Sequence, residues 1–218
     1  MWLLLQLADS AFPSGGFAHS AGLEAAAQLG EVRGPGEVRS FVEQSLWQAG
    51  FGALPFVRAA CLAPDALAAH DALCHAFLSN HVANRASRAQ GRAFLATAAQ
   101  VFPREPIKAL DQAVRARSIH GHHAPIFGAV SAALGLSVDD AERLHLHLAL
   151  RGVSSAAVRL GLLGPQEAQR IQHELAPLLD RVLARCGALG LDEVAQTSPH
   201  LDLLGSLHDR LYARLFSS

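Results

Sequence analysis

Glycine and proline divide this chain into short segments, and within most of them the apolar residues recur at helical spacing. Val38, Phe41, Val42 and Leu46, for example, would lie along one face of a helix. No repeat of short strands and turns is visible. The pattern predicts an all-α protein, a single-domain bundle of about ten helices.

Gly and Pro positions give the bounds of the expected helices. These helices cover residues 20–29, 37–49, a short segment ending near 62, a segment starting at 64–65, 82–101, 106–118, 125–134, 137–163, 166–186 and 199–216. Ser137 followed by Asp140 is an N-terminal capping pattern. Residues 144–148 alternate Leu and His as a strand would, but the cap before them favours a helix.

No linker divides the chain, so we expect one domain over residues 1–218. Its last segment, residues 198–218, carries a leucine stripe at helical spacing that ends at Phe216, which we expect to be exposed. Such a helix either packs on its own domain or docks on a partner. We predict a C-terminal helix or tail that docks on a partner.

Charge and composition exclude several functions. The net charge is −1, which argues against nucleic acid as a partner because phosphate neutralisation needs a basic surplus. No apolar run is long enough to span a membrane, and the N-terminus lacks the basic residues of a signal peptide. Three scattered cysteines without a CxxC motif indicate free thiols in a reducing cytoplasm. The mean hydropathy of +0.21 indicates either a well-filled core or apolar surface meant for a partner.

The only lysine, Lys108, does not follow a glycine-rich loop, so the chain has no phosphate loop. The chain is therefore not itself a P-loop GTPase or ATPase. The nucleophile elbow of a Ser-His-Asp hydrolase is also absent, because the Pro13–Gly16 turn follows no α/β strand pattern. We predict no catalytic residues and no bound cofactor.

Histidines offer the main candidate metal site. His120, His122 and His123 stand together, and imidazoles on a turn can share a nickel, zinc or copper ion. The alternative is a solvent-exposed loop before a helix. His70 and Cys74 would share one helix face, for which a partly buried cysteine beside a surface histidine is the simpler interpretation.

Two other features point to partner binding. The Pro13-Ser14-Gly15-Gly16 turn combines a fixed backbone angle with two permissive glycines, a geometry that brings the backbone close to another element. Arg85, Arg88 and Arg92 fall on one helical stripe, which either holds carboxylates of a partner or is an ordinary solvated face.

From end to end, the sequence resembles the UreF family of urease accessory proteins. The resemblance rests on the opening motif, three internal blocks and the closing motif, namely Leu4–Ser10 with Pro13, Gly15–Phe17, Ser20 and Gly22–Glu24; Arg85, Ser87 and Gly91; Pro125, Phe127–Gly128 and Leu134–Gly135; Ser155–Leu160 with Gln169; and Ser198–Pro199 through Arg214–Phe216 and Ser218. The chain departs from the family at His208-Asp209, where His-Glu is usual, and at Gly205. Both departures touch the tail and leave its helicity the least secure part of the resemblance.

The resemblance implies an all-helical homodimer that assembles with UreD (UreH in some organisms) and the GTPase UreG to deliver nickel to apo-urease in the cytoplasm. It implies an adaptor, not an enzyme, that recruits UreG and modulates its GTP hydrolysis. The tail would contact UreD, and the turn and the arginine stripe would meet UreG. We expect the partner-binding residues to be Gly15, Gly16, His19, Glu24, Arg85, Arg88, Ser198, Pro199, His208, Arg214 and Phe216. The alternative is a nickel metallochaperone that uses His120, His122 and His123 or the His70–Cys74 pair.

Overall fold

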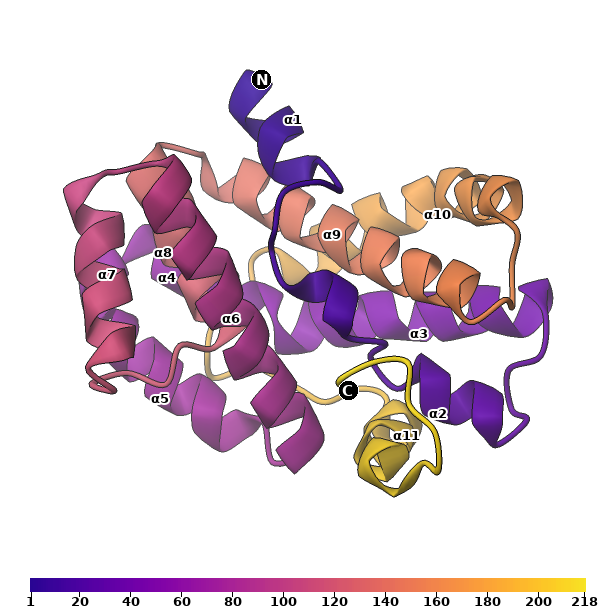
Figure 1. The fold of residues 1–218 in the computed structure, drawn as a ribbon. Coiled ribbons are helices and arrows are strands. Elements are labelled where there is room, and N and C mark those ends of the chain that lie inside the picture. Colours follow the sequence, from indigo (N-terminus) through magenta and orange to yellow (C-terminus); the bar gives the residue numbers. More distant parts are fainter.

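The computed structural model describes all 218 residues and contains eleven α-helices, three short 3-10 helices and no strand (Figure 1). The α-helices are α1 (Trp2–Ala8), α2 (Leu23–Gln28), α3 (Pro35–Gly52), α4 (Leu54–Leu62), α5 (Leu67–Phe77), α6 (His81–Val101), α7 (Glu105–Arg115), α8 (His123–Leu134), α9 (Val138–Arg159), α10 (Pro165–Cys186) and α11 (Pro199–Leu207). The 3-10 helices are η1 (Gly16–Ala18), η2 (Pro64–Ala66) and η3 (His208–Arg210). The predicted all-α class is confirmed.

Capping residues and prolines set the start of several helices. The Ser137 hydroxyl accepts the Asp140 N–H at 3.1 Å and caps α9, as its sequence pattern predicts. The Asn80 side chain accepts the N–H groups of Val82 and Ala83 and caps α6 in the same way. Pro35 and Pro165 are the first residues of α3 and α10. Proline lacks a backbone N–H, but at this position an N–H would have no acceptor within the helix.

Some bounds differ from the predicted ones, and backbone angles account for most of the differences. Helix α2 starts after Gly22, whose φ of 88° cannot continue a right-handed helix. Helix α7 ends before Arg117 at φ 58°, and α9 ends before Gly161 at φ 72°, so both are shorter than expected. Helix α1 was not among the predicted helices.

The apolar interior forms two clusters that share two helices, α4 and α9. One cluster of 24 buried residues is built from α2, α3, α10 and α11, and the other, of 21, from α1 and α4 to α8. Helix α4 contributes Leu54 to the first cluster and Phe56 to the second. Helix α9 lies between the clusters, with Leu146 in the first and Leu144 in the second. This position explains the alternating segment, because a helix between two cores buries residues on opposite sides.

Glycines allow α8 to pack closely at the centre of the second cluster. A Cβ on Gly128 would overlap the Val57 carbonyl oxygen of α4, and a Cβ on Gly91 of α6 would overlap the Gly121 carbonyl oxygen before α8. Helix α8 is buried almost along its whole length. The prediction of one domain stays a prediction; α9 and the chain ends join the two clusters.

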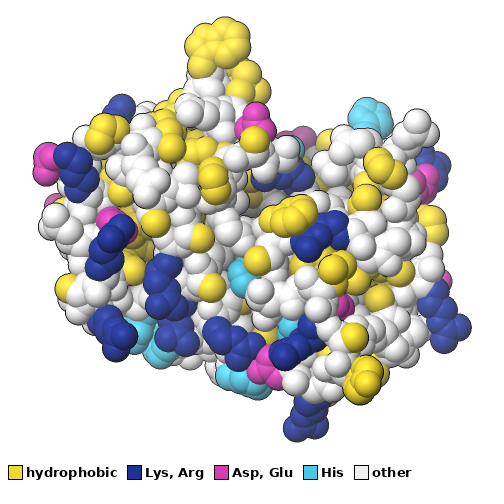
Figure 2. Space-filling model, in the orientation of Figure 1, with side chains coloured by type: hydrophobic (Ala, Val, Ile, Leu, Met, Phe, Trp, Pro, Cys, Tyr) yellow, Lys and Arg dark blue, Asp and Glu magenta, His cyan; other side chains and the backbone are white.

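Apolar side chains also remain at the surface. Trp2 and Leu5 on α1, and Met1 before it, are exposed, and α1 projects from the molecule (Figures 1 and 2). No single helix is both long and apolar enough to cross a bilayer, and the one helix pair that passes by length and composition is bent by 118°. Both explanations of the positive hydropathy, a filled core and apolar surface, therefore have support in the structure.

Candidate functional site

The segment after α1 lies against α6, as its glycines predict. Phe12 is buried beside the rings of Phe94 and Phe102, and the Pro13 carbonyl accepts the Thr97 hydroxyl at 2.9 Å. Gly15 has φ 75°, and a Cβ there would lie 2.8 Å from the Ala93 Cβ. Only glycine meets both conditions without strain, so this turn fixes the N-terminal segment on α6.

The C-terminal segment folds back onto this N-terminal segment (Figure 1). The predicted helix to Phe216 is wrong, because α11 ends at Leu207 and the chain after η3 is not helical. Phe216 is also buried, not exposed as expected. The backbone turns extended at Leu211, and further along the N–H groups of Leu215 and Phe216 bond to the Glu24 carboxylate at 2.5 and 3.2 Å.

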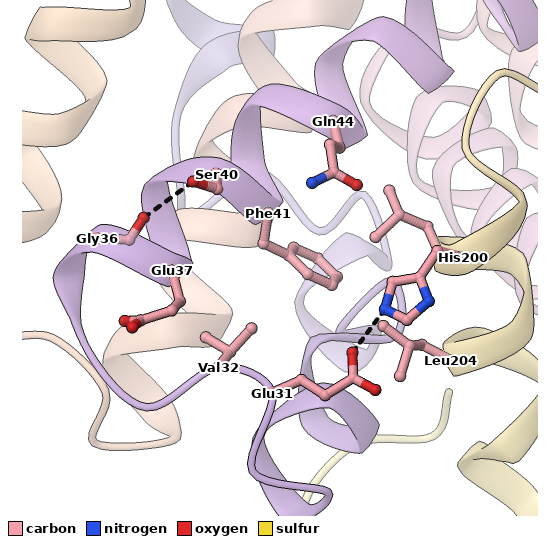
Figure 3. A pocket seen from close by; sticks show the side chains of 10 residues that line it. Glu31, Val32, Gly36, Glu37, Ser40, Phe41, Gln44, His200 and Leu204 are labelled. Atoms are coloured by element: carbon pink, nitrogen blue, oxygen red, sulfur yellow. Dashed lines mark hydrogen bonds and ion pairs between the residues drawn. The ribbon is translucent and has the colours of Figure 1, made fainter.

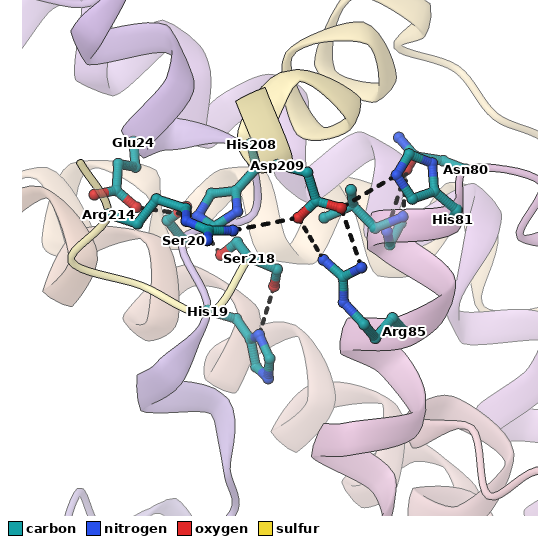
Figure 4. Close-up of polar contacts among 12 residues, drawn as sticks. His19, Ser20, Glu24, Asn80, His81, Arg85, His208, Asp209, Arg214 and Ser218 are labelled. Atoms are coloured by element: carbon teal, nitrogen blue, oxygen red, sulfur yellow. Dashed lines mark hydrogen bonds and ion pairs between the residues drawn. The ribbon is translucent and has the colours of Figure 1, made fainter. Parts of the chain in front are cut away.

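Glu24 and His208 form the buried centre of the contact between the two segments. His208 is fully buried and Glu24 is 2% exposed, and their Nε2 and Oε2 atoms lie 3.1 Å apart (Figure 4). With the two tail amides, the Glu24 carboxylate has three partners in all. Because a buried carboxylate is costly without such partners, Glu24 holds the tail in place and depends on it.

A second group of bonds joins His19 and Ser20 to Ser218. The Ser218 carbonyl accepts two bonds from Ser20, one from its N–H at 2.6 Å and one from the Ser20 hydroxyl at 3.1 Å. The hydroxyl of Ser218 itself lies 2.5 Å from His19 Nδ1. The Ser217 N–H bonds to the Ala18 carbonyl at 2.8 Å. Burial lowers the pKa of His19, and the neighbouring His208 and Arg85 lower it further.

Asp209 connects the tail to the arginine stripe of α6. Arg85 donates two bonds to its carboxylate, at 2.7 and 3.1 Å, in a fork-to-carboxylate geometry (Figure 4). His81 lies 3.3 Å and Arg214 3.6 Å from the same carboxylate. The hydrogen bond from Arg85 lowers the pKa of Asp209. Asp209 therefore reaches the stripe from the tail.

Arg159 is a site residue that the sequence reasoning did not select. Its guanidinium lies 3.8 Å from the centre of the Phe17 ring and 4.2 Å from that of Phe216, and it donates to the Phe17 carbonyl. Arg159, at the end of α9, thus makes cation–π contacts with one aromatic residue from each end of the chain. The signal in the sequence was only its place in a block that resembles the family.

The remaining predicted partner-binding residues lie at the edges of this site. Gly16 approaches Gln90 of α6, and the Ser198 N–H before Pro199 bonds to the Gln48 side chain at 2.9 Å. Arg88 follows Arg85 on α6 but has no acidic partner, and its Nε is buried without an acceptor. His19, Glu24, His208 and Phe216 belong to the contact between the two segments. Arg85 and Arg214 both contact Asp209 of the tail, and Gly15 lies against α6.

His120, His122 and His123 do not converge on one point. His120 stacks on His75 with ring centres 3.8 Å apart, and His122 Nε2 lies 3.1 Å from His75 Nδ1. His123 instead packs in the core against Phe94 and Phe127. The exposed-loop alternative is wrong for His122 and His123, which are buried at the start of α8.

Groups at the start of α8 are bonded to one another. The Asp71 carboxylate accepts the N–H groups of His120, Gly121 and His122. Burial lowers the pKa of His122 to about 4, so its imidazole is neutral. No group of three or more His, Cys, Asp or Glu side chains is arranged to hold a metal ion. Burial raises the pKa of the other candidate, Cys74, to about 12, so its thiol is protonated.

A groove of about 390 Å³ lies on another part of the surface, between α3, α11 and the chain before α3 (Figure 3). Phe41 and Leu204 line it, and His200 bonds to Glu31 at its edge at 2.6 Å. None of the predicted site residues lies in this groove.

Comparisons with known proteins agree with the resemblance. The UreF family profile matches residues 32–176. The chain is 41% identical to the urease accessory protein F of Oryza sativa subsp. indica over 220 residues, which covers 99% of this chain and 84% of the rice protein. It is 39% identical to the protein of the same name from Arabidopsis thaliana, covering 100% and 92% of the two chains. It is 31% identical to the urease accessory protein UreF of Trichodesmium erythraeum, covering 99% and 95%.

Proposed function

The chain belongs to the UreF family of urease accessory proteins, and from that premise we propose that it is a non-catalytic adaptor in urease maturation. In this proposal it forms a homodimer in the cytoplasm, assembles with UreD (or UreH) and the GTPase UreG, and so delivers nickel to apo-urease. It modulates GTP hydrolysis by UreG and performs none itself.

The observation that carries the proposal is the joining of the two end segments into one surface. Glu24 and Arg85 hold the tail in a defined conformation through buried and two-point hydrogen bonds. These bonds order the non-helical tail, in which Tyr212 and Leu215 are exposed at 105% and 53%. Phe17 of the N-terminal segment is exposed at 68%. A rigid surface with exposed aromatic and aliphatic groups is typical of a protein-binding site.

We assign the tail to UreD and the Gly15–Gly16 turn with the arginine stripe to UreG. The turn lies directly on the stripe helix, since Gly16 approaches Gln90 of α6. One partner can therefore contact both features at once. Because the chain has no phosphate loop, nucleotide chemistry belongs to the partner in this proposal.

The metallochaperone alternative has less support. His122 already bonds to His75, and His123 faces the core away from both. Equilibrium dialysis of the isolated protein with nickel tests this alternative. We expect no tight stoichiometric binding; a tight site lost on replacing His120, His122 and His123 by alanine would replace the adaptor with a metallochaperone.

Size-exclusion co-elution with UreD and UreG tests the adaptor. Deleting residues 198–218 would also remove Leu201 and Leu204 from the core, so a surface variant is the sharper tool. Tyr212→Ser with Leu215→Ser changes only exposed side chains, because the tail is held at 215 through its backbone N–H. We expect the wild-type chain to co-elute with UreD and this double variant to lose UreD.

Leu62→Ser is the matched control, since Leu62 is exposed at 62% on α4, outside the proposed surface. It should keep both partners. Light scattering of the isolated protein should give the mass of a dimer. If the wild-type chain binds neither folded partner under reducing conditions, the adaptor function is wrong. Equal loss of UreD by the tail variant and the control would refute the assignment of the tail.

A further inference from the structure

Helix α6 carries three positive charges and no negative one. Its 21 residues include three arginines on one stripe and no Asp or Glu. Helix α10, of 22 residues, carries acidic side chains among its arginines. A one-signed helix surface on a chain of net charge −1 needs an explanation beyond solubility.

Several other surface arginines pair with acids of their own helices. Arg39 bonds to Glu43, Arg143 to Asp139 and Arg170 to Glu167. On α6, only Arg85 has a carboxylate, and Asp209 of the tail supplies it. The stripe therefore relies on carboxylates from outside its helix.

Arg88 and Arg92 have no such carboxylate. The Nε of Arg88 is buried without any acceptor, and the Nε of Arg92 donates to the Arg88 carbonyl at 3.1 Å. A buried N–H without an acceptor is unfavourable and is rare in folded proteins. Figure 2 shows basic side chains gathered on this face, over α6 and the tail, with few acidic ones between them.

We propose that Arg88 and Arg92 bind two carboxylates of an acidic helical segment on a partner protein. This inference rests on the proposed adaptor function and specifies the chemistry of one contact. The Asp209 carboxylate on Arg85 shows the binding mode within the chain itself, a two-point bond at 2.7 and 3.1 Å. Arg85 is already occupied, so the next two arginines along the stripe form the free site.

The spacing of the two arginines defines the occupant further. They lie four residues apart, which is about 6 Å along a helix axis at about 1.5 Å per residue. Two acidic residues at positions i and i+4 of a partner helix have the same spacing. A nucleic acid fits less well, because an extended phosphate backbone needs a larger basic surplus than a chain of net charge −1 offers.

The test measures the affinity of the two partners of the proposed function for Arg88→Glu with Arg92→Glu, at about 0.1 and 0.5 M salt. We expect UreG, to which the stripe is assigned, to bind at least about tenfold more weakly at low salt, and the loss to shrink at high salt because screening weakens ion pairs. Arg88→Lys with Arg92→Lys keeps the charge and removes the forks, so we expect an intermediate loss. The lysine variant also keeps the test valid if the glutamate variant does not fold.

Arg181→Glu with Arg185→Glu is the matched control. These arginines are also four residues apart, lie exposed on α10 and have no acidic partner, so the change in charge and spacing is the same. The control should bind both partners within about twofold of wild type. Wild-type affinity of the α6 variant for both partners, or an equal loss in the control, would overturn the inference. Wild-type affinity of the lysine variant would overturn the two-point geometry. Failure of the wild-type chain to bind either partner would refute the proposed function itself, and this inference with it.

Discussion

Replacing Glu24 by glutamine tests whether its buried carboxylate holds the tail. The two side chains have the same shape, but an amide has one acceptor oxygen where the carboxylate has two. In the native structure Oε1 accepts the Leu215 N–H, and Oε2 bonds to both His208 and the Phe216 N–H. If the amide oxygen takes the position with two partners, its NH2 group faces the Leu215 N–H, and that donor loses its acceptor.

The magnitude follows from these contacts. One buried donor without an acceptor costs about 1–3 kcal/mol, and weakening two charge-assisted bonds costs roughly 0.5–1 kcal/mol each. We therefore expect Glu24→Gln to lower the free energy of unfolding by about 2–5 kcal/mol. For a chain of this size that corresponds to a fall in Tm of roughly 4–20 °C. The loss in the free energy of unfolding cannot exceed the free energy that holds the tail on α2, because a larger penalty would release the tail instead.

Urea unfolding and amide hydrogen exchange measure the two consequences. Exchange at Leu215 and Phe216 should accelerate in Glu24→Gln while core amides of α8 stay protected. Glu31→Gln is the matched control, because Glu31 makes the same kind of bond to His200 at an exposed site. It should change stability by less than about 1 kcal/mol. Unchanged stability and unchanged exchange of the tail amides in Glu24→Gln would refute this account.

Two further predictions concern the turn and a buried acid. Gly15→Ala should destabilise the protein by about 1–3 kcal/mol in thermal unfolding, because φ is 75° and the new Cβ would lie 2.8 Å from the Ala93 Cβ. Gly36→Ala is the control and should be close to neutral, because a Cβ at Gly36 would meet no atom within 4 Å. Burial raises the pKa of Glu142 to about 7 from 4.5, although Arg58 opposes the shift. The folded state therefore holds a proton that the unfolded state releases between these values, and stability falls as pH rises through this window. Glu142→Gln removes that dependence, so between pH 5 and 8 the variant should gain roughly 1–3 kcal/mol relative to wild type in urea titrations; parallel curves would contradict the burial of a neutral carboxyl.

The predicted helices were mostly correct because helix formation depends on neighbours in the sequence. The cap at Ser137 and the proline before α10 act within one turn of the chain. Even the alternating Leu and His residues of α9 were assigned to a helix from their flanks. Their alternation itself had a tertiary cause, the position of α9 between two apolar clusters.

The errors in the candidate site all involve contacts between distant residues. The non-helical tail is held by Glu24, 191 residues before Leu215, whose carboxylate accepts the Leu215 N–H. His122 and His123 are buried because α6 and α8 approach closely at Gly91. Neither a helical period nor a histidine count contains that information.

The sequence by itself determined the helical class, most of the helix bounds, the close approach of the Gly15 turn and the family. These depend on local backbone preferences and on motifs that can be read residue by residue. Only the tertiary structure decided which arginine of α6 binds a carboxylate and how Arg159 joins Phe17 to Phe216. It also decided that the tail is a non-helical segment held by hydrogen bonds. The physical reason is that a buried carboxylate and a cation between two rings gain their energy from partners that are distant in the chain and adjacent only after folding.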